Sequence, residues 1–272
     1  MTTTHREILT ESAISAIIAE GYAISVASPQ ARAYTTKSSL ADLVTSVDLA
    51  VQERLVAALT VLTPDAAFLT EEGPVPQNVD GLVWVIDPLD GITNFAHALP
   101  HCAISVALYD SFQPVLGIIH QPFSGLTYHG SVSLGAFVRS PSGSDRPLHV
   151  SSVSTLTQAL ASFGLPYDSR LSDQAFAAAR TIFDVSKDLR RSGSPALDLA
   201  WLSDGIFDLH VEALLHPRDA AAGAIILELA GGTLSDWHGD PVNWLTHQAG
   251  APVLASNTLL HPELLGLLSA LN

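Results

Sequence analysis

The first sixty residues carry apolar side chains at helical spacing. Residues 1–19 mix charged side chains into apolar positions three and four apart, which predicts an amphipathic helix. Residues 47–59 predict a second helix, because Val51, Leu55 and Leu59 fall on one face. No stretch approaches the roughly 18 apolar residues of a membrane span, and residues 1–19 lack the apolar core of a signal peptide. We therefore expect a cytoplasmic protein without a membrane partner.

Short apolar runs in the middle of the chain predict strands. The later runs are separated by turn residues, so we expect a meandering sheet that ends before an exposed turn at residues 140–146. After this turn, helix-like and strand-like segments alternate, which predicts a second α/β half. The expected strands are residues 66–70, 82–86, 103–108, 115–119, 135–139, 159–163 and 206–211, and the expected helices are residues 169–185, 196–202 and 220–230.

The chain shows neither an internal repeat nor a low-complexity linker. We therefore expect two halves, residues 1–145 and 146–272, that pack against each other as one unit. A length of 272 residues with 47% hydrophobic residues is sufficient to bury a substantial core.

The balance of charge narrows the classes of partner. The chain has 12 Lys and Arg against 27 Asp and Glu, a formal net charge of −15, which opposes contact with nucleic acid. Cys102 is the single cysteine, so an internal disulfide is excluded and nothing indicates a zinc or iron–sulfur site. The acidic residues either cover the surface, where they aid solubility, or gather around a hard cation.

Two carboxylates stand close together in the segment 87–91. Asp87 and Asp90 are three residues apart, the proline between them presets φ, and Gly91 tolerates a positive φ. The chain can therefore turn and aim both carboxylates at one cation. The turn also exposes the carbonyl of Leu89, and the amides of a short expected helix after Gly91 can bind an anion. The ordinary alternative is that both aspartates only accept hydrogen bonds within the turn.

Further acidic residues stand at the ends of expected elements. Glu71 and Glu72 follow a strand, Asp42 and Asp48 lie near the start of the second helix, and Asp219 precedes an alanine-rich helix. Alone, each is explained by a helix cap or a solvated loop. Together with Asp87 and Asp90 they make four such groups, three of them beside small or apolar sequence, and this coincidence implies buried carboxylates that require cations. With only 12 basic residues in the chain, a divalent ion is the expected partner, and oxygen ligands favour Mg²⁺.

The acidic groups also match a known pattern in their order and separation. The matching segments are Lys37-Ser38-Ser39, Asp42-Leu43-Val44-Thr45, Glu71-Glu72, Asp87-Pro88-Leu89-Asp90-Gly91 and Asp219-Ala220-Ala221-Ala222-Gly223, with further similarity at residues 164–167 and 190–200. Together they resemble the inositol monophosphatases, in particular the bacterial branch. The resemblance covers about residues 37–232 and implies a layered α-β-α-β-α sandwich that forms a homodimer and is inhibited by Li⁺.

The resemblance also implies roles for individual residues. Two or three Mg²⁺ ions would join the enzyme to the phosphate of an inositol or sugar phosphate, which metal-activated water hydrolyses. Glu212 would accept hydrogen bonds from substrate hydroxyls, although an exposed charge at a strand end is its ordinary explanation. The implied metal ligands are Glu71, Asp87, Asp90, Asp219 and the Leu89 carbonyl, and the implied substrate-binding residues are Gly91, Ile92, Thr93, Glu212 and Asp219.

Two of the departures from the family concern the chemistry of this site. Ile92 replaces a threonine whose hydroxyl, with the residues matching Asp48 and Glu71, activates the attacking water. We expect hydrolysis to be slowed by about 10²–10⁴, with Glu71 or Thr93 activating the water. The alternative is a degenerate homologue that binds a phosphorylated ligand or a protein partner without efficient turnover. Arg218 replaces the usual tryptophan and would either compete with the metal or face the phosphate.

Overall fold

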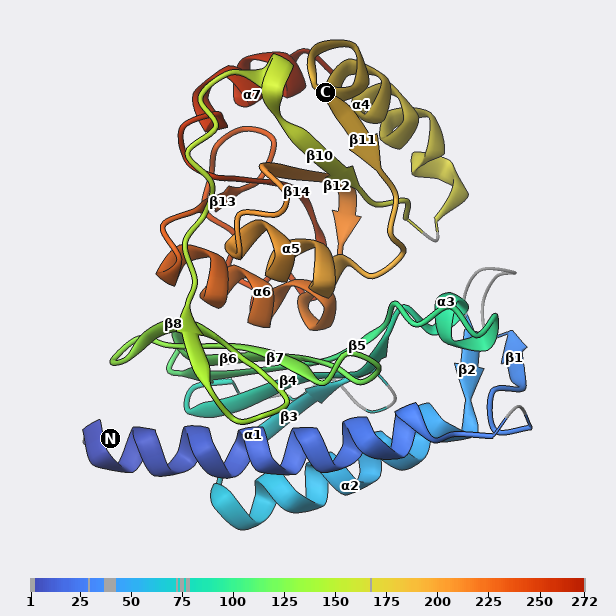
Figure 1. Ribbon diagram of the computed structural model, residues 1–272, viewed down its shortest axis with the longest axis vertical. Coiled ribbons are helices and arrows are strands. Elements are labelled where there is room, and N and C mark those ends of the chain that lie inside the picture. The colour runs from blue at the N-terminus through green and yellow to red at the C-terminus, as the bar shows by residue number, and fades with distance from the viewer. Residues whose placement is uncertain are drawn as a thin grey trace.

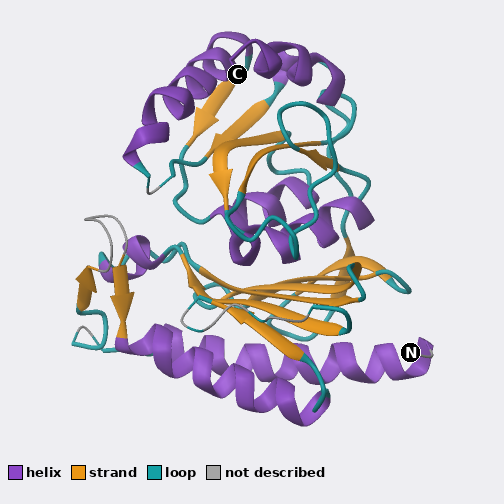
Figure 2. Ribbon diagram, turned by 180° about the vertical axis from the view of Figure 1, so that it is seen from behind, coloured by secondary structure: helices purple, strands orange, loops and turns teal. Residues whose placement is uncertain are grey.

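Helices and sheets alternate in five layers (Figure 1), and the view from behind shows the same layering (Figure 2). The computed structural model describes residues 3–28, 30–36, 43–71, 73, 76, 79–166 and 168–271, without the side chains of Thr3, Thr36, Leu43 and Val44. Residues 37–39, Asp42, Glu72 and Tyr167, which belong to the matching segments, lie outside these residues. Within the described residues the layers are α1 (Thr3–Ser25) with α2 (Ser46–Leu62), a larger sheet of seven strands, α5 (Pro195–Ser203) with α6 (Pro217–Leu229), a smaller sheet of five strands, and α4 (Ser172–Val185) with α7 (His261–Leu268). The layered sandwich is confirmed.

The larger sheet is a meander whose strands follow chain order from β3 to β9. All neighbours are antiparallel except β3 and β4, which are parallel. The expected boundary after residue 145 falls inside β9, so a division of the chain there stays a prediction. The strands are β3 (Ala67–Thr70), β4 (Leu82–Asp90), β5 (Ala103–Asp110), β6 (Gln113–Gln121), β7 (Leu126–Ser131), β8 (Gly135–Arg139) and β9 (Asp145–Pro147).

Sequence patterning did not predict β7, because the buried positions of this strand include polar side chains. Thr127, His129 and Ser131 are all buried. Thr127 is satisfied by a 2.9 Å hydrogen bond between its Oγ1 and Nδ1 of His120 on the neighbouring strand. A polar strand of this kind depends on its partners in the sheet, which no local pattern records.

The smaller sheet has the order β11-β10-β12-β14-β13 and mixes parallel with antiparallel pairs. The strand expected at residues 206–211 begins later and runs further, and nothing was predicted beyond residue 230. The strands are β10 (Leu160–Phe163), β11 (Asp188–Arg190), β12 (Leu209–Leu215), β13 (Thr233–Ser235) and β14 (Ala251–Ser256).

Helix α6 lies between the two sheets and has to be narrow. Ala220, Ala221 and Ala222 are fully buried. On the facing strand β6, a Cβ at Gly117 would lie 2.5 Å from the carbonyl oxygen of Ala222. Small residues on both elements therefore allow the close approach that carries Asp219, in the first turn of α6, towards the larger sheet.

Two short strands, β1 (Tyr34–Thr36) and β2 (Leu43–Thr45), pair antiparallel beyond the ends of α1 and α2 (Figure 2). They lie beside α3 (Ile92–Ala96), the short helix expected after Gly91. This corner of the molecule adjoins the segment that carries the predicted phosphate-binding turn.

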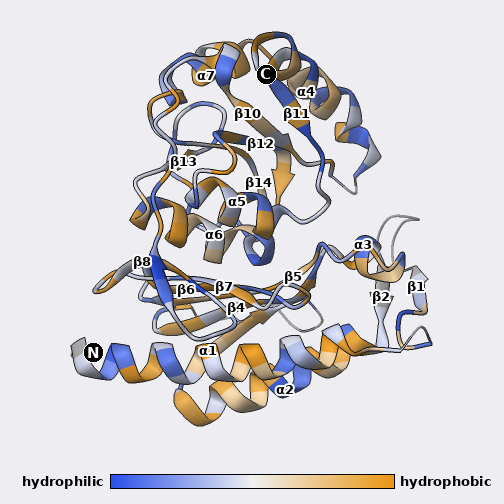
Figure 3. Cartoon of the chain, viewed as in Figure 1, coloured by the Kyte–Doolittle hydropathy of each residue, from blue (hydrophilic) through white to orange (hydrophobic). Residues whose placement is uncertain are grey.

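Helix α1 lies along the outer face of the larger sheet, where Leu9, Ile14 and Ile17 are buried. Ile8 and Tyr22 are exposed, so its apolar residues are less confined to one face than expected (Figure 3). Residues 4–25 of α1 are long and apolar enough to cross a membrane, which corrects the expectation that no stretch approaches a membrane span, although core helices of soluble proteins share this length and hydropathy.

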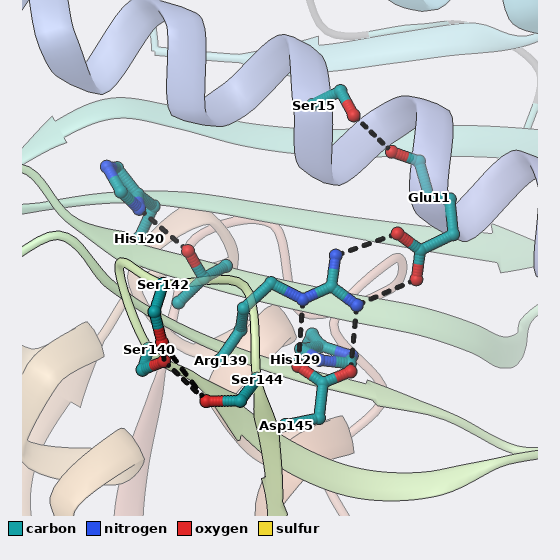
Figure 4. Close-up of polar contacts among 10 residues, drawn as sticks. Glu11, Ser15, His120, His129, Arg139, Ser140, Ser142, Ser144 and Asp145 are labelled. Atoms are coloured by element: carbon teal, nitrogen blue, oxygen red, sulfur yellow. Dashed lines mark hydrogen bonds and ion pairs between the residues drawn. The ribbon is translucent and has the colours of Figure 1, made fainter.

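A cluster of ionic contacts fastens α1 to the edge of the larger sheet (Figure 4). The guanidinium of Arg139 donates two hydrogen bonds to Glu11 of α1, at 2.7 and 2.8 Å, and two of 2.8 Å to Asp145 of β9. These hydrogen bonds hold the pKa of Glu11 and of Asp145 below their usual values. Bidentate contacts of this kind fix the orientation of a helix better than single exposed ion pairs do.

Candidate active site

A cavity of about 570 Å³ is lined by residues from both sheets and from the helices between them. Most of the predicted site residues meet there, although they are spread over about 150 positions of sequence. Asp48 and Thr93 are predicted residues that do not line it. The predicted residues that line the cavity are Glu71, Asp87, Leu89, Asp90, Gly91, Ile92, Glu212 and Asp219.

Three carboxylates form the centre of the cavity. Asp87, Asp90 and Asp219 each offer an oxygen atom, and these atoms lie within 4.8 Å of one another. Burial raises the pKa of Asp87 well above its usual value, and the charges of Glu71 and Asp219 raise it further. Burial and the charge of Asp219 likewise raise the pKa of Asp90. Carboxylates gathered in this way repel one another unless protons or a cation neutralise them.

Strand β4 delivers Asp87 and Asp90 through an irregularity. It continues to Asp90 instead of ending at residue 86, and its pairing with β5 shifts between the two aspartates. Oδ1 of Asp87 accepts a 2.9 Å hydrogen bond from the amide of Leu89, so the ordinary turn contact coexists with a position in the cavity. Gly91 follows with a φ of 86°, and a Cβ there would lie 2.9 Å from the carbonyl oxygen of His101. Only glycine suits this position.

Asp90 is held in place by the second half of the chain. Its Oδ2 accepts hydrogen bonds from the hydroxyl of Ser194, at 2.5 Å, and from the amide of Ala196, at 2.9 Å, at the start of α5. One oxygen is thereby fixed by the protein, and Oδ1 is left for a cation. Sequence reasoning noted the similarity at residues 190–200 but missed this role of Ser194, for which its position just before Pro195 and the helix was the available signal.

Arg218 lies directly beside the acidic centre. Its Nη2 is 3.8 Å from Oε1 of Glu71, and its Nε is 3.7 Å from Oδ1 of Asp219. These separations are longer than good hydrogen bonds, so the guanidinium acts as a nearby counter-charge. Its charge lowers the pKa of Asp87 and thereby opposes the effect of the carboxylates around it.

The residues predicted to activate water differ in their relation to the cavity. Ile92 lines the cavity, but its side chain is buried in an apolar cluster with Leu89 and Phe95. Thr93 is exposed and lies outside the cavity lining. Asp48 is buried in the first turn of α2, where its amide donates a 3.2 Å hydrogen bond to Oγ1 of Thr45. Of the predicted water-activating residues, Glu71 alone lines the cavity with a carboxylate.

Glu212 of β12 also lines the cavity and is buried, so it is not the exposed charge of the ordinary alternative. Arg191 and Asp198 are further lining residues. Sequence reasoning did not assign a role to Arg191, although its place in the segment 190–200 was noted. Besides the three aspartates, the cavity therefore offers the carboxylates of Glu212 and Asp198 and, from the segment between β11 and α5, the cationic side chain of Arg191.

Comparison with known proteins agrees with this geometry. The profile of the inositol monophosphatase family matches residues 4–272. The chain is 32% identical over 243 residues to the inositol-1-monophosphatase of Caulobacter vibrioides, covering 86% of this chain and 90% of that protein. It is 32% identical over 262 residues to the inositol-1-monophosphatase of Synechocystis sp., covering 96% and 88%. A solved structure of inositol monophosphatase from Anabaena (Nostoc) sp. superposes with a TM-score of 0.82 at 30% identity, covering 97% of this chain and 96% of that one. The chain belongs to the inositol monophosphatase family.

Proposed function

We propose that this protein is a Mg²⁺-dependent phosphatase that hydrolyses a phosphate monoester of inositol or of a related polyol or sugar. The observation that carries the proposal is the cluster of the buried Asp87 and Asp90 with the half-buried Asp219, in a cavity that Glu212 also lines. Membership of the family and the names of the relatives support the reaction class. The proposal includes a cytoplasmic homodimer that is inhibited by Li⁺, on the strength of the resemblance alone.

The residues at the acidic centre fit Mg²⁺. The donors are all oxygen atoms. Burial and then mutual repulsion raise the pKa of Asp87 and Asp90, and divalent cations would offset both effects. When bound, such ions neutralise the charge of a phosphate and promote ionisation of the attacking water. The proposed ligands for two or three ions are Glu71, Asp87, Asp90, Asp219 and the Leu89 carbonyl.

The protein's own groups bind the substrate and move a proton. The amides of Gly91 and Ile92, in the tight turn after β4, donate hydrogen bonds to the phosphate. Glu71 accepts a proton from water as the water oxygen bonds to phosphorus and the bond from phosphorus to the alcohol oxygen breaks. The alcohol oxygen takes up a proton and leaves, while Glu212 accepts hydrogen bonds from neighbouring hydroxyls. Ile92 contributes no hydroxyl, so we expect a slow enzyme.

Release of inorganic phosphate from inositol 1-phosphate and from a panel of sugar phosphates, with and without Mg²⁺, tests the proposal. We expect release only with Mg²⁺. Replacement of a central ligand in Asp90→Asn should lower kcat/KM at least about 100-fold, because one negative charge at the metal is lost. The matched control is Asp184→Asn, which removes an exposed carboxylate that pairs with Arg180 on α4 and should leave activity unchanged.

Absence of Mg²⁺-dependent release at high enzyme concentration would contradict the proposal. Calorimetric titration with inositol 1-phosphate would then show whether the protein binds a phosphorylated ligand without turning it over, as the degenerate homologue would.

A further inference from the structure

A buried histidine stands behind Glu212. His210 lies two residues earlier on β12, so the two side chains share a face of the strand. Nε2 of His210 is 3.4 Å from Oε2 of Glu212. Both atoms are buried, and neither has a hydrogen-bond partner of good geometry among the described residues, so their contact is an ion pair. Among the described residues, Nε2 of His210 is therefore paired with the carboxylate of Glu212 alone, and Oε2 of Glu212 is paired with this imidazole alone.

Asp198 of α5 and Ser162 of β10 support the other ring nitrogen of His210. Nδ1 is 3.6 Å from Oδ2 of Asp198 and 2.9 Å from Oγ of Ser162. Oδ1 of Asp198 in turn accepts a 2.6 Å hydrogen bond from the hydroxyl of Ser192. The imidazole thus lies between two buried carboxylates that come from different elements, both of which line the cavity.

The surroundings favour a positively charged ring. Burial by itself would lower the pKa of His210, but the contact with Glu212 and the negative charge of Asp198 outweigh it, and the pKa is raised. The pKa of Glu212 stays above its usual value, because burial raises it more than the contact with His210 and the charge of Arg191 lower it, and the charge of Asp219 adds to the rise. A cationic His210 is therefore the main support for an ionised Glu212 in a buried place.

Gly164 also lies against the carboxylate of Glu212. A Cβ at Gly164 would lie 1.9 Å from Oε2 and 2.5 Å from Oε1 of Glu212. The backbone of residue 164 is held near β12 by a 3.1 Å hydrogen bond from its amide to the carbonyl of Val211. With the imidazole at one oxygen and a glycine against the carboxyl group, Glu212 has little freedom to turn.

We propose that His210 is a positioning residue, which is supported by Asp198 and holds Glu212 ionised and in one orientation to accept hydrogen bonds from a pair of hydroxyl groups on a polyol phosphate. This inference rests on the proposed function for its substrate class. His210 would then influence the preference for phosphate esters that carry neighbouring hydroxyls, although it does not touch the substrate itself.

The test compares kcat and KM for inositol 1-phosphate and for p-nitrophenyl phosphate, which has no such hydroxyls. His210→Phe removes both charge and donor, and His210→Gln keeps a donor without charge. We expect His210→Phe to lower the preference for inositol 1-phosphate about 10-fold, mainly through KM, because a charge-assisted hydrogen bond to the substrate is lost. His210→Gln should recover part of the preference.

The matched control is His261→Gln, which removes another buried ring that is bound only by the hydroxyls of Ser235 and Ser256 in the described structure. It should reduce stability and leave the preference unchanged. Between pH 6 and 8 the preference of His210→Phe should rise more steeply with pH than that of the unaltered protein, because burial raises the pKa of Glu212 and the imidazole that lowers it is removed. Burial raises the pKa of Asp198 to about 7, so some dependence on pH is expected for both proteins. Equal losses for both substrates, or a control that behaves like His210→Phe, would overturn the proposal.

Failure of the proposed function is recognised separately, because the unaltered protein would then hydrolyse neither substrate. In that case ¹⁵N chemical shifts of the imidazole decide. A cationic His210 at pH 7.5 that becomes neutral in Glu212→Gln supports the pairing, and a neutral ring in the unaltered protein refutes it.

Discussion

Ile92 separates the binding of phosphate from the activation of water. Its amide belongs to the proposed phosphate turn, whereas its side chain packs with Leu89 and Phe95. A buried aliphatic group at this place adds to the core and offers neither a proton donor nor an acceptor. Thr93 does not compensate, because its side chain is exposed outside the cavity. Glu71 therefore remains as the proposed proton acceptor.

Ile92→Thr should lower the stability of the fold and raise the rate of hydrolysis. A hydroxyl in an apolar cluster and the loss of one methylene should lower the free energy of unfolding by about 1–2 kcal/mol. If a positioned hydroxyl limits the reaction, kcat should rise by about 10-fold or more. Denaturant unfolding and steady-state kinetics measure the two effects. Ile92→Val serves as control, because valine has the shape of threonine without its hydroxyl. A kcat for Ile92→Thr within a few-fold of the unaltered value would show that another residue activates the water.

Helix α6 shows how one element sets both packing and chemistry. Its alanine face allows the helix to lie between the two sheets, and its first turn presents Asp219 to the carboxylates of β4. The close approach of Ala222 to Gly117 fixes the depth of the helix over β6. A change in this spacing should therefore reach the acidic centre without touching any of its residues.

Gly117→Ala tests this coupling. The added methyl has to push against backbone atoms of α6, so we expect a loss of about 1–3 kcal/mol in the free energy of unfolding and a reduced affinity for Mg²⁺. Gly266→Ala is the matched control, since a Cβ at that position of α7 meets nothing within 4 Å. It should stabilise the protein by about 0.5–1 kcal/mol and leave Mg²⁺ affinity unchanged. Equal Mg²⁺ affinity in both variants would argue against the coupling.

At the scale of the whole molecule, the acidic centre joins the two halves of the chain. Asp87 and Asp90 come from the larger sheet, Asp219 comes from α6, and Ser194 and Ala196 bind Asp90 from the start of α5. Bound cations would therefore tie together elements that the unfolded chain separates. Mg²⁺ should act as a stabilising ligand of the entire fold.

We expect Mg²⁺ at about 100 times its Kd to stabilise the fold by about 2.7 kcal/mol and to raise Tm by about 5–10 °C. The gain should grow with pH. Asp87 and Asp90 have a higher pKa in the folded protein than in the unfolded chain. Their protonated carboxyls therefore contribute fully to the stability of the metal-free fold below the unfolded pKa of about 3.9, and this contribution is lost as the pH rises through the folded pKa. Thermal unfolding between pH 5 and 8 measures the gain, and the control is the same protein in Mg²⁺-free buffer with a chelator. A gain that falls with rising pH would contradict the assignment.

Local patterns in the sequence predicted many of the elements and the segments that carry the site. Apolar runs of suitable length marked β4, β5 and β6, and helical spacing marked α2, α4 and α6, because burial of one face imposes a period on the chain. They did not predict β7, β13 or β14, whose stability depends on neighbouring strands.

The sequence by itself determined which chemical groups are available, and the spacing of its acidic residues was sufficient to indicate an oxygen-lined metal site. Only the tertiary structure decided which of those groups meet. Ser194 and Ala196 bind Asp90 across 104 and 106 positions of sequence, and His210 lies between Asp198 and Glu212. Periodicity reports which face of an element is buried, but the partner on the other side is chosen by the packing of whole layers.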